Sequence, residues 1–293
     1  MLRLAFLALL VITGTMSADR PLLTWPDLIG RAKLTPNATI SYGADEMQKA
    51  DIWTPSGKGP FPTVLMVHGG CWTTSIADRS LMNWIADDLR KSGYAVWNID
   101  YRGVDRAGGG YPGTFLDVAN AADALRANAA KFHLDVTRVV AVGHSAGGHL
   151  ALWLAGRANL PKDSPLRVGK PLKVASVVSL GGLPDLEATA ASQDNGCGTD
   201  VVAQLVGTGR RNVYADTSVT SLLPLGVPQH LVNGREDRII PFRLATDYVA
   251  KASKAGDRVT LHTVPATGHV ELIAPETAAW AQTKRLIRAA FTK

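Results

Sequence analysis

Residues 138–150 read Arg-Val-Val-Ala-Val-Gly-His-Ser-Ala-Gly-Gly-His-Leu, an apolar run followed by a Gly-x-Ser-x-Gly pattern centred on Ser145. The β-branched run 138–142 predicts a buried strand, and the stretch 148–156 after the pattern is compatible with a helix. A serine on a tight strand-to-helix turn needs small residues two positions away, because the strand and the helix approach closely there. This stretch therefore predicts Ser145 as a nucleophile on such a turn.

The same alternation continues on both sides of this stretch. Further apolar runs predict buried strands at 63–67, 95–99, 174–180, 229–232 and 259–264. Amphipathic stretches between them predict helices at 78–91, 114–132, 242–255 and 276–291. Strands that alternate with helices indicate the α/β class, with a mostly parallel, doubly wound sheet covered on both faces. Residues 19–48 are rich in turn residues and show little periodicity.

One segment interrupts the alternation. Residues 183–225 form a long, turn-rich stretch between two predicted strands. A connection of that length in a compact domain usually serves function, so the pattern predicts a short cap insertion. The chain has 293 residues, of which 46% are hydrophobic and 19% charged, which is enough apolar material for a large core. We expect one catalytic domain over residues 19–293.

The first residues have the order of an export signal. Arg3 supplies a positive start, residues 4–13 are apolar, and Thr15, Ser17 and Ala18 are small, as a signal-peptidase site requires. The apolar run is shorter than the roughly 20 residues that span a bilayer. A buried strand or a short anchor would also be apolar, but neither explains the order of charge, apolar run and small residues. We expect residues 1–18 to be a cleaved signal peptide and the mature protein to be periplasmic or secreted, without membrane attachment.

Charge and cysteine content exclude several classes of partner. The formal net charge is +6, but the Lys and Arg residues are scattered, whereas a nucleic-acid surface needs them clustered. Cys71 and Cys197 are the two cysteines, and export would permit a disulfide, although two separate thiols fit the sequence equally well. No short paired spacing of four ligands indicates zinc. We expect no nucleic-acid partner and no metal.

A second motif, His68-Gly-Gly-Cys-Trp72, directly follows the predicted strand 63–67. Acyl transfer through a tetrahedral intermediate needs N–H donors aimed at the developing oxyanion, and each donor contributes about 3–4 kcal/mol to its stabilisation. Ala146 after the serine predicts one donor, and the loop of Gly69, Gly70 and Cys71 predicts the other. Without the serine motif, this loop would be an ordinary Gly-Gly turn.

The serine also needs a general base and an acid that orients it. In a fold whose order is serine, acid, histidine, His269 is the candidate base because it follows the last predicted strand. Asp237 follows the strand 229–232 and is the candidate acid, with Asp185 and Glu236 as alternatives. The remaining histidines are not expected to act as the base: His68, His133, His144, His149, His230 and His262.

Taken together, the motifs resemble the α/β-hydrolase superfamily, near the kynurenine formamidase-like and feruloyl-esterase-like carboxylesterases. The resemblance runs from Ile40 to the C-terminus and rests on 68–72, 100–102 (Asp-Tyr-Arg), 143–150, 234–237 and 268–269. His-Gly-Gly-x-Trp is typical of the formamidase-like group, whereas hormone-sensitive-lipase-like enzymes have a third glycine in place of Cys71. The resemblance implies an α/β-hydrolase fold and the triad Ser145, Asp237 and His269.

These observations predict a serine hydrolase that cleaves short-chain or aryl carboxylic esters through an acyl-enzyme, without a cofactor. Trp72 and His144 are expected to line the pocket for a small-molecule ester or amide. An arylformamidase is the main alternative, although export would separate it from a cytosolic formamide substrate. A peptidase of this superfamily would need a large extra domain, and a non-catalytic binding protein would not need every motif. The sequence does not indicate an oligomeric state.

Overall fold

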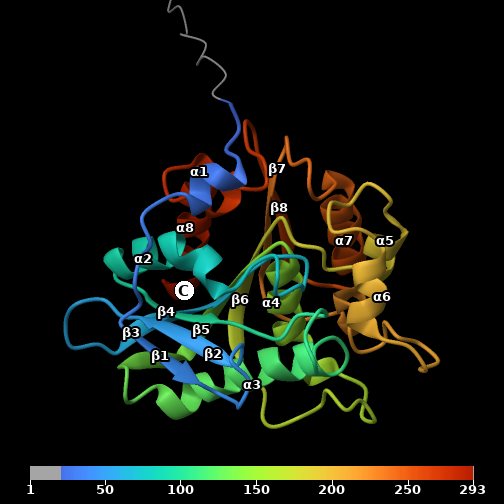
Figure 1. Cartoon of the computed structure of the whole chain (residues 1–293), viewed down its shortest axis with the longest axis horizontal. Coiled ribbons are helices and arrows are strands. Elements are labelled where there is room, and N and C mark those ends of the chain that lie inside the picture. The colour runs from blue at the N-terminus through green and yellow to red at the C-terminus, as the bar shows by residue number, and fades with distance from the viewer. Residues whose placement is uncertain (1–20, 293) are drawn as a thin grey trace, which may run out of the picture.

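The computed structural model describes residues 21–292 and has a sheet of eight strands at its centre (Figure 1). The predicted signal segment, residues 1–18, lies outside the described residues. The strand order is β1-β2-β4-β3-β5-β6-β7-β8. β1 and β2 are antiparallel to each other and β2 is antiparallel to β4, whereas all pairs from β4 to β8 are parallel. The prediction of a mostly parallel α/β sheet is confirmed.

All six predicted strands are present. The strands are β1 (Ala38–Ser41), β2 (Lys49–Trp53), β3 (Phe61–Val67), β4 (Ala95–Ile99), β5 (Leu134–His144), β6 (Val174–Leu180), β7 (Gln229–Gly234) and β8 (Val259–Val264). The sequence pattern did not predict β1 and β2. Both strands are short, and polar residues interrupt their apolar pattern. Buried Asp51 in β2 accepts a hydrogen bond from the Thr39 hydroxyl of β1 and forms an ion pair with Arg79. A short strand that polar residues interrupt has no continuous apolar run to recognise.

The helices follow the predicted amphipathic stretches closely. They are α1 (Trp25–Ile29), α2 (Asn83–Lys91), α3 (Gly113–Asn128), α4 (Ala146–Gly156), α5 (Leu186–Ala191), α6 (Asp200–Val206), α7 (Phe242–Lys254) and α8 (Ala278–Phe291), with 3-10 turns η1 (Arg79–Met82), η2 (Arg157–Asn159), η3 (Val219–Leu222) and η4 (Glu271–Ile273). α3 ends before the predicted residue 132, because the chain reverses into β5 through His133, which has a φ of 53°. α1 lies in the stretch for which no element was expected.

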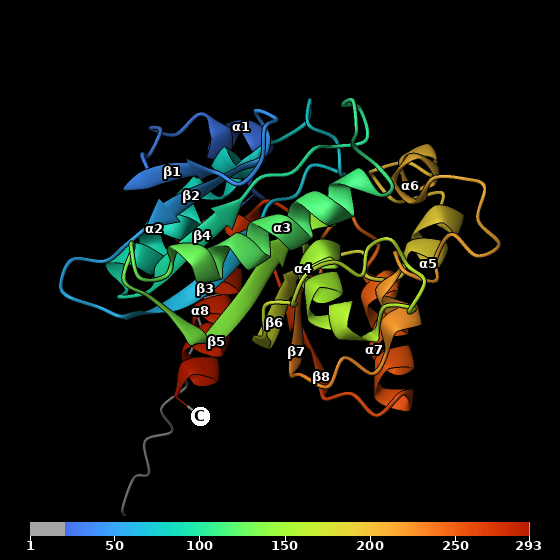
Figure 2. The ribbon, with the colours of Figure 1, turned by 90° about the horizontal axis from the view of Figure 1, so that it is seen from below.

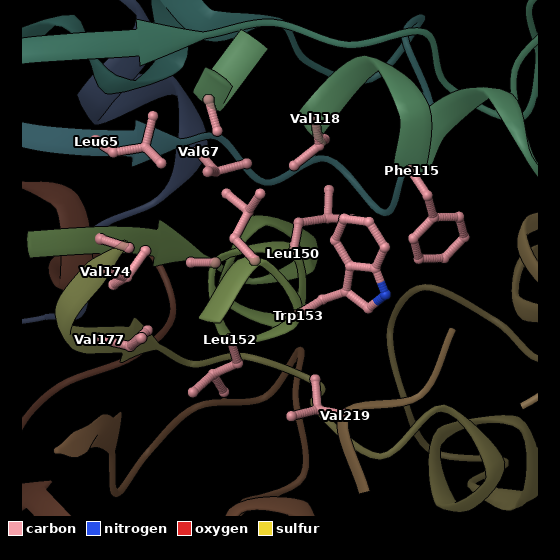
Figure 3. Close-up of a cluster of buried hydrophobic side chains, with 14 of the residues drawn as sticks. Leu65, Val67, Phe115, Val118, Leu150, Leu152, Trp153, Val174, Val177 and Val219 are labelled. Atoms are coloured by element: carbon pink, nitrogen blue, oxygen red, sulfur yellow. The ribbon is translucent and has the colours of Figure 1, made fainter. Parts of the chain in front are cut away.

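Helices cover both faces of the sheet (Figure 2). α3, α4 and α7 pack on one face, and α2 and α8 pack on the other. Alternate residues of β3 point to opposite faces, so that Leu65 and Val67 join the first core and Val64 and Met66 join the second. Figure 3 shows α4 in the first core, where its apolar residues meet the sheet on one side and α3 on the other. Burial on both faces explains why these strands are continuous apolar runs.

The turn between β5 and α4 has no room for side chains on its glycines. A Cβ on Gly143 would lie 2.0 Å from the Gly147 carbonyl oxygen, and a Cβ on Gly147 would lie 2.2 Å from the Val67 carbonyl oxygen. Ser145 between them has a φ of 54° and a ψ of −123°, and its N–H donates to the Leu180 carbonyl at 2.8 Å. Glycine at both positions is therefore a steric requirement of packing α4 against β5 and β3.

The segment predicted as a cap, residues 183–225, contains α5, α6 and η3 and lies beside α7. Cys197 in this segment forms a disulfide with Cys71 in the loop after β3, with Cα atoms 5.3 Å apart. The bond joins the cap segment to the end of the sheet at which β3 and β5 stop. Within residues 21–292, no helix combines the length and apolar character needed to cross a bilayer.

A Gly147→Ala substitution tests the steric requirement at the turn. The added methyl group meets the Val67 backbone, which cannot move without disturbing the sheet, so we expect a loss of about 3 kcal/mol in the free energy of unfolding. Gly156→Ala in the same helix is the matched control, since its added Cβ lies 3.0 Å from the Leu222 side chain, which can shift. Urea denaturation measures both. Equal stability of the two variants would contradict the steric argument.

Candidate active site

Ser145, Asp237 and His269 lie at the carboxyl end of the sheet, after β5, β7 and β8 respectively. Ser145 and His269 line the same cavity, which has a volume of about 290 Å³. Both side chains are largely buried, with exposed fractions of 3% for Ser145 and 4% for His269. The structure thus brings together the serine and the histidine that the sequence separates by more than a hundred residues.

Asp237 holds the His269 ring. The Nδ1–H of His269 donates to Asp237 Oδ2 at 2.7 Å, and both side chains are almost inaccessible to solvent. The other oxygen of Asp237 accepts the backbone N–H groups of Ile239 at 2.8 Å and Ile240 at 2.9 Å. Because these backbone bonds fix the carboxylate, the carboxylate in turn fixes the orientation of the imidazole and leaves its Nε2 for the cavity.

The two alternative acids lie elsewhere. Asp185 accepts from Lys251 Nζ at 2.5 Å and caps the start of α5 through the Ala188 N–H. Glu236 accepts a hydrogen bond from the Thr267 N–H at 3.0 Å and so supports the loop that carries His269, here called the histidine loop. The structure pairs Asp237 with His269 and gives the other two carboxylates structural partners.

Glu271, to which no sequence motif pointed, is a further support of the same loop. Its carboxylate is 6% exposed and accepts the Gly268 N–H at 2.9 Å. Its second oxygen accepts the N–H of Leu23, from the segment just before α1. A glutamate two residues after a histidine is a common sequence feature, so only the packed structure shows that it ties the N-terminal segment to the histidine loop.

His144 lies beside His269 and also lines the cavity. Their ring centroids are 4.4 Å apart, and the Nε2–H of His144 donates to the His269 carbonyl at 3.2 Å. Burial is the main cause that lowers the pKa of the His144 imidazole well below its ordinary value, and the neighbouring His269 lowers the pKa further. A neutral His144 therefore holds the His269 backbone without placing a second positive charge in the cavity.

The loop after β3 adjoins Ser145. A Cβ on Gly69 would lie 3.0 Å from the Ser145 Cβ, so a side chain there would meet the serine. Gly70 has a φ of 100° and lines the cavity together with Cys71, which has a φ of 51°. Ala146 is the first residue of α4, and its N–H therefore has no carbonyl partner within the helix. The residues predicted as oxyanion donors thus surround the serine.

His68 braces this loop from the side of the sheet. Its Nε2 lies 2.9 Å from Asp100 Oδ1, and its Nδ1 lies 2.6 Å from the Gly69 carbonyl. The ring stacks on Tyr101 with a centroid distance of 4.4 Å, and the Tyr101 hydroxyl donates to the His68 carbonyl at 3.0 Å. Arg79 completes the network by donating to Asp100 at 2.8 Å. Asp100 and Tyr101 therefore support the loop through His68, whereas Arg102 pairs with Asp117.

The prediction that Trp72 lines the substrate pocket is wrong. Trp72 is fully buried in the core beneath the cavity, where its Nε1–H donates to His149 Nδ1 at 3.2 Å. A φ of 55° at Trp72 turns its side chain inward, a direction that the residue type alone does not reveal. Trp25 of α1 is instead the tryptophan that lines the cavity.

No metal-binding cluster is found in the described part of the chain, where no group of three or more His, Cys, Asp or Glu side chains is arranged to hold an ion. The chemistry available at the site is that of a hydroxyl, an imidazole and a buried carboxylate, with backbone N–H groups beside the hydroxyl. These are the components of nucleophilic acyl transfer.

The sheet order, the turn at Ser145 and the position of His269 define an α/β-hydrolase. The chain belongs to the BD-FAE family, whose model matches residues 50–251. The matched range includes Ser145 and Asp237, whereas His269 lies after it.

Comparisons with individual proteins agree with this family. Esterase LipC of Mycobacterium tuberculosis is 26% identical over 277 residues, covering 88% of this chain and 68% of LipC. The acylamino-acid-releasing enzyme of Rattus norvegicus is 26% identical over 227 residues, but the match covers 73% of this chain and only 29% of that enzyme. The chain thus spans about two thirds of the first relative and less than a third of the second.

Solved structures share the fold. A truncated carbohydrate esterase from gut microbiota has a TM-score of 0.74 at 22% identity, covering 89% of this chain and 99% of that one. Esterase B from Lactobacillus Rhamnosis also has a TM-score of 0.74, at 19% identity, covering 89% of this chain and 88% of that one. At these identities the likeness concerns the arrangement of strands and helices.

The buried His149 predicts a pH dependence of stability. It accepts from Trp72 and donates through Nε2–H to the Thr217 carbonyl at 2.8 Å, which requires the neutral ring. The pKa of His149 is lowered to about 4, because burial lowers it by more than the hydrogen bond to Thr217 raises it. Above about pH 6.5 the ring is neutral in both states. As the pH falls towards 4, His149 takes up a proton mainly in the unfolded state. We therefore expect the free energy of unfolding to fall by about 3 kcal/mol.

Urea denaturation at about pH 7 and about pH 4 measures this loss for the native chain and for His149→Gln. Glutamine offers one acceptor and one donor but does not titrate, so the variant should lose about 3 kcal/mol less than the native chain between these two conditions. The same pH dependence in both proteins would refute the assignment to His149.

The disulfide predicts a second, independent effect on stability. A bond that closes 126 residues stabilises by about 4–5 kcal/mol in the chain-entropy model. The double variant Cys71→Ser, Cys197→Ser should therefore unfold at lower urea concentration, and reduced native protein should match it. Alkylation without a reductant followed by intact-mass measurement is the control, since two labelled thiols would show that the bond is absent.

Proposed function

We propose that this chain is a serine hydrolase that cleaves carboxylic esters with short-chain or aryl groups through an acyl-enzyme. The observation that carries this proposal is that Ser145 and His269 face one small cavity while Asp237 binds the far nitrogen of His269 at 2.7 Å. A serine hydroxyl is a weak nucleophile unless a base removes its proton in the transition state. The arrangement supplies that base together with the group that orients it.

In the proposed mechanism, the Nε2 of His269 removes the proton from Ser145 as the serine oxygen attacks the acyl carbon. The protonated imidazole then donates that proton to the leaving alcohol, and an acyl group remains on Ser145. Water attacks the acyl-enzyme with His269 as the base, which releases the acid and restores the serine. Asp237 holds the ring in the required tautomer throughout.

The N–H groups of Ala146 and Gly70 are the proposed oxyanion donors, with Gly69 and Cys71 shaping the loop. Two features support this role: Ala146 begins α4, where its N–H is not used in the helix, and Gly70 lines the cavity with a φ of 100°. Each donor would contribute about 3–4 kcal/mol to the stabilisation of the tetrahedral intermediate.

The names of two relatives support ester hydrolysis. Two similar proteins of Mycobacterium tuberculosis are named an esterase and a probable carboxylic ester hydrolase, and the latter match covers 55% of that relative. A cavity of about 290 Å³ lies at the lower end of the range for small-molecule sites, which favours small esters. An arylformamidase activity is the second candidate, supported by the His-Gly-Gly-Cys-Trp motif at 68–72.

Export of the mature protein remains part of the proposal. The order of charge, apolar residues and small residues in 1–18 supports it, and a disulfide between Cys71 and Cys197 is compatible with an oxidising compartment.

A substrate panel on the native chain and on Ser145→Ala tests the function. We expect hydrolysis of p-nitrophenyl acetate, p-nitrophenyl butyrate and methyl ferulate by the native chain, and a loss of at least about 10⁴-fold in kcat for Ser145→Ala, because the nucleophile is gone. Ser75→Ala is a matched control, as Ser75 is exposed and lies outside the cavity lining. A fluorophosphonate probe should label the native chain at Ser145 and leave Ser145→Ala unlabelled.

The same panel separates the competing functions. Faster turnover of N-formylkynurenine than of any ester would favour the arylformamidase, and a strong preference for p-nitrophenyl laurate would contradict the short-chain proposal. A chain that neither hydrolyses the panel nor reacts with the probe would be a binding protein on this fold.

A further inference from the structure

We infer that α1 is the specificity-determining element of this site, and that Trp25 closes the Ser145 cavity around an uncharged acyl group, either short-chain or aryl. The inference rests on the proposed ester hydrolysis and assigns the substrate class to particular residues. It concerns a segment far from the serine motif in sequence, which carries no recognisable motif of its own.

Trp25 is part of the wall next to the reacting groups. Its indole ring lies 6.2 Å from the ring of His269 and 6.2 Å from the ring of His144, with interplanar angles of 78° and 72°. These edge-to-face contacts place the indole against both imidazoles. Ile29, one turn further along α1, also lines the cavity, so that α1 supplies one side of it.

α1 is held in this position by the histidine loop itself. The N–H of Leu23 and the N–H of Gly268 donate to opposite oxygens of the buried Glu271. Leu28, a residue of α1, is fully buried. Arg31, just after α1, forms an ion pair with Glu276 through two hydrogen bonds. Figure 1 shows α1 beside the red C-terminal part of the chain, to which these contacts belong. The same contacts therefore hold both α1, which forms one side of the cavity, and the loop that carries His269.

The cavity suits an uncharged apolar group. Apart from the glycines, Cys71, His144, Ser145 and His269, its lining is apolar: Trp25, Ile29, Ile76, Ala77, Leu81 and Ile239. No Lys, Arg, Asp or Glu is among the described residues that line it. A charged acyl group would lose its hydration there without gaining a partner. Ile29 and Ile76 at the cavity are 58% and 63% exposed, which leaves apolar surface for a ligand to cover.

A second hollow of about 510 Å³ adjoins this cavity, and Trp25 lines it as well. Trp25, Ile239 and His269 line both spaces, but the second has Arg238 and Glu236 at its wall and does not include Ser145. The leaving alcohol takes its proton from His269, whereas the acyl group stays on Ser145 beside the oxyanion loop. The apolar cavity, which is lined by Ser145, Gly70 and Cys71, is therefore the acyl site, and the second hollow, which is lined by none of them, is neighbouring space that a longer acyl chain could use.

Removal of the indole should join the two spaces. We expect Trp25→Ala to raise the ratio of kcat/KM for p-nitrophenyl laurate to that for p-nitrophenyl butyrate by at least about 10-fold, since each methylene in an apolar pocket changes kcat/KM by about 10-fold or more. Trp25→Phe keeps an aromatic wall and should stay close to the native ratio. Tyr94→Ala is the control for loss of a half-buried aromatic ring, because Tyr94 stacks on Phe291 away from the cavity.

A second variant works in the opposite direction. Ile29→Trp adds bulk at an exposed position of α1 and should lower kcat/KM for the butyrate ester relative to the acetate ester by at least about 10-fold. A native acyl-length profile in both Trp25→Ala and Ile29→Trp would overturn the assignment of α1. If the native chain hydrolyses these esters, that result overturns only this inference; if the native chain neither hydrolyses them nor reacts with the fluorophosphonate probe, the proposed function fails first.

Discussion

The close approach of α4 to β5 and β3 is the constraint on which the site depends. Gly143 and Gly147 allow backbone to meet backbone where any Cβ would lie about 2 Å from a carbonyl oxygen. Ser145 is thereby held in a left-handed conformation that places it at the carboxyl end of the sheet, with the free N–H of Ala146 next to it. The nucleophile and one proposed oxyanion donor are thus consequences of a single packing contact.

Carboxylates organise the opposite side of the site. Asp237 binds the His269 ring, while Glu236 and Glu271 bind the N–H groups of Thr267 and Gly268 just before it. The neutral His144 then holds the His269 carbonyl. Charge is therefore concentrated behind the imidazole, and the cavity in front of it remains apolar. This separation suits a reaction in which charge develops only on the acyl oxygen and the imidazole.

Part of the cavity wall comes from segments that are remote from the motifs. α1 contributes Trp25 and Ile29, and the cap segment contributes Gly196 beside the disulfide-bonded Cys197. The central strands were predictable because burial on both faces makes them apolar runs. β1, β2 and α1 were not predictable, because they are only four or five residues long and polar residues interrupt them. The same reason applies to the cavity walls, which have no local pattern of their own.

The class of fold, Ser145 and the loop at 68–72 could be predicted from the residues alone, because the steric demands of a tight turn act over a few neighbouring residues and must appear in their identities. The sequence also indicated His269 through its position after the last strand. Three facts required the folded chain: Asp237 and not Asp185 binds His269, Trp72 is buried, and Trp25 lines the cavity. Such contacts join segments that are distant along the chain, and they depend on how helices and loops pack rather than on any local spacing.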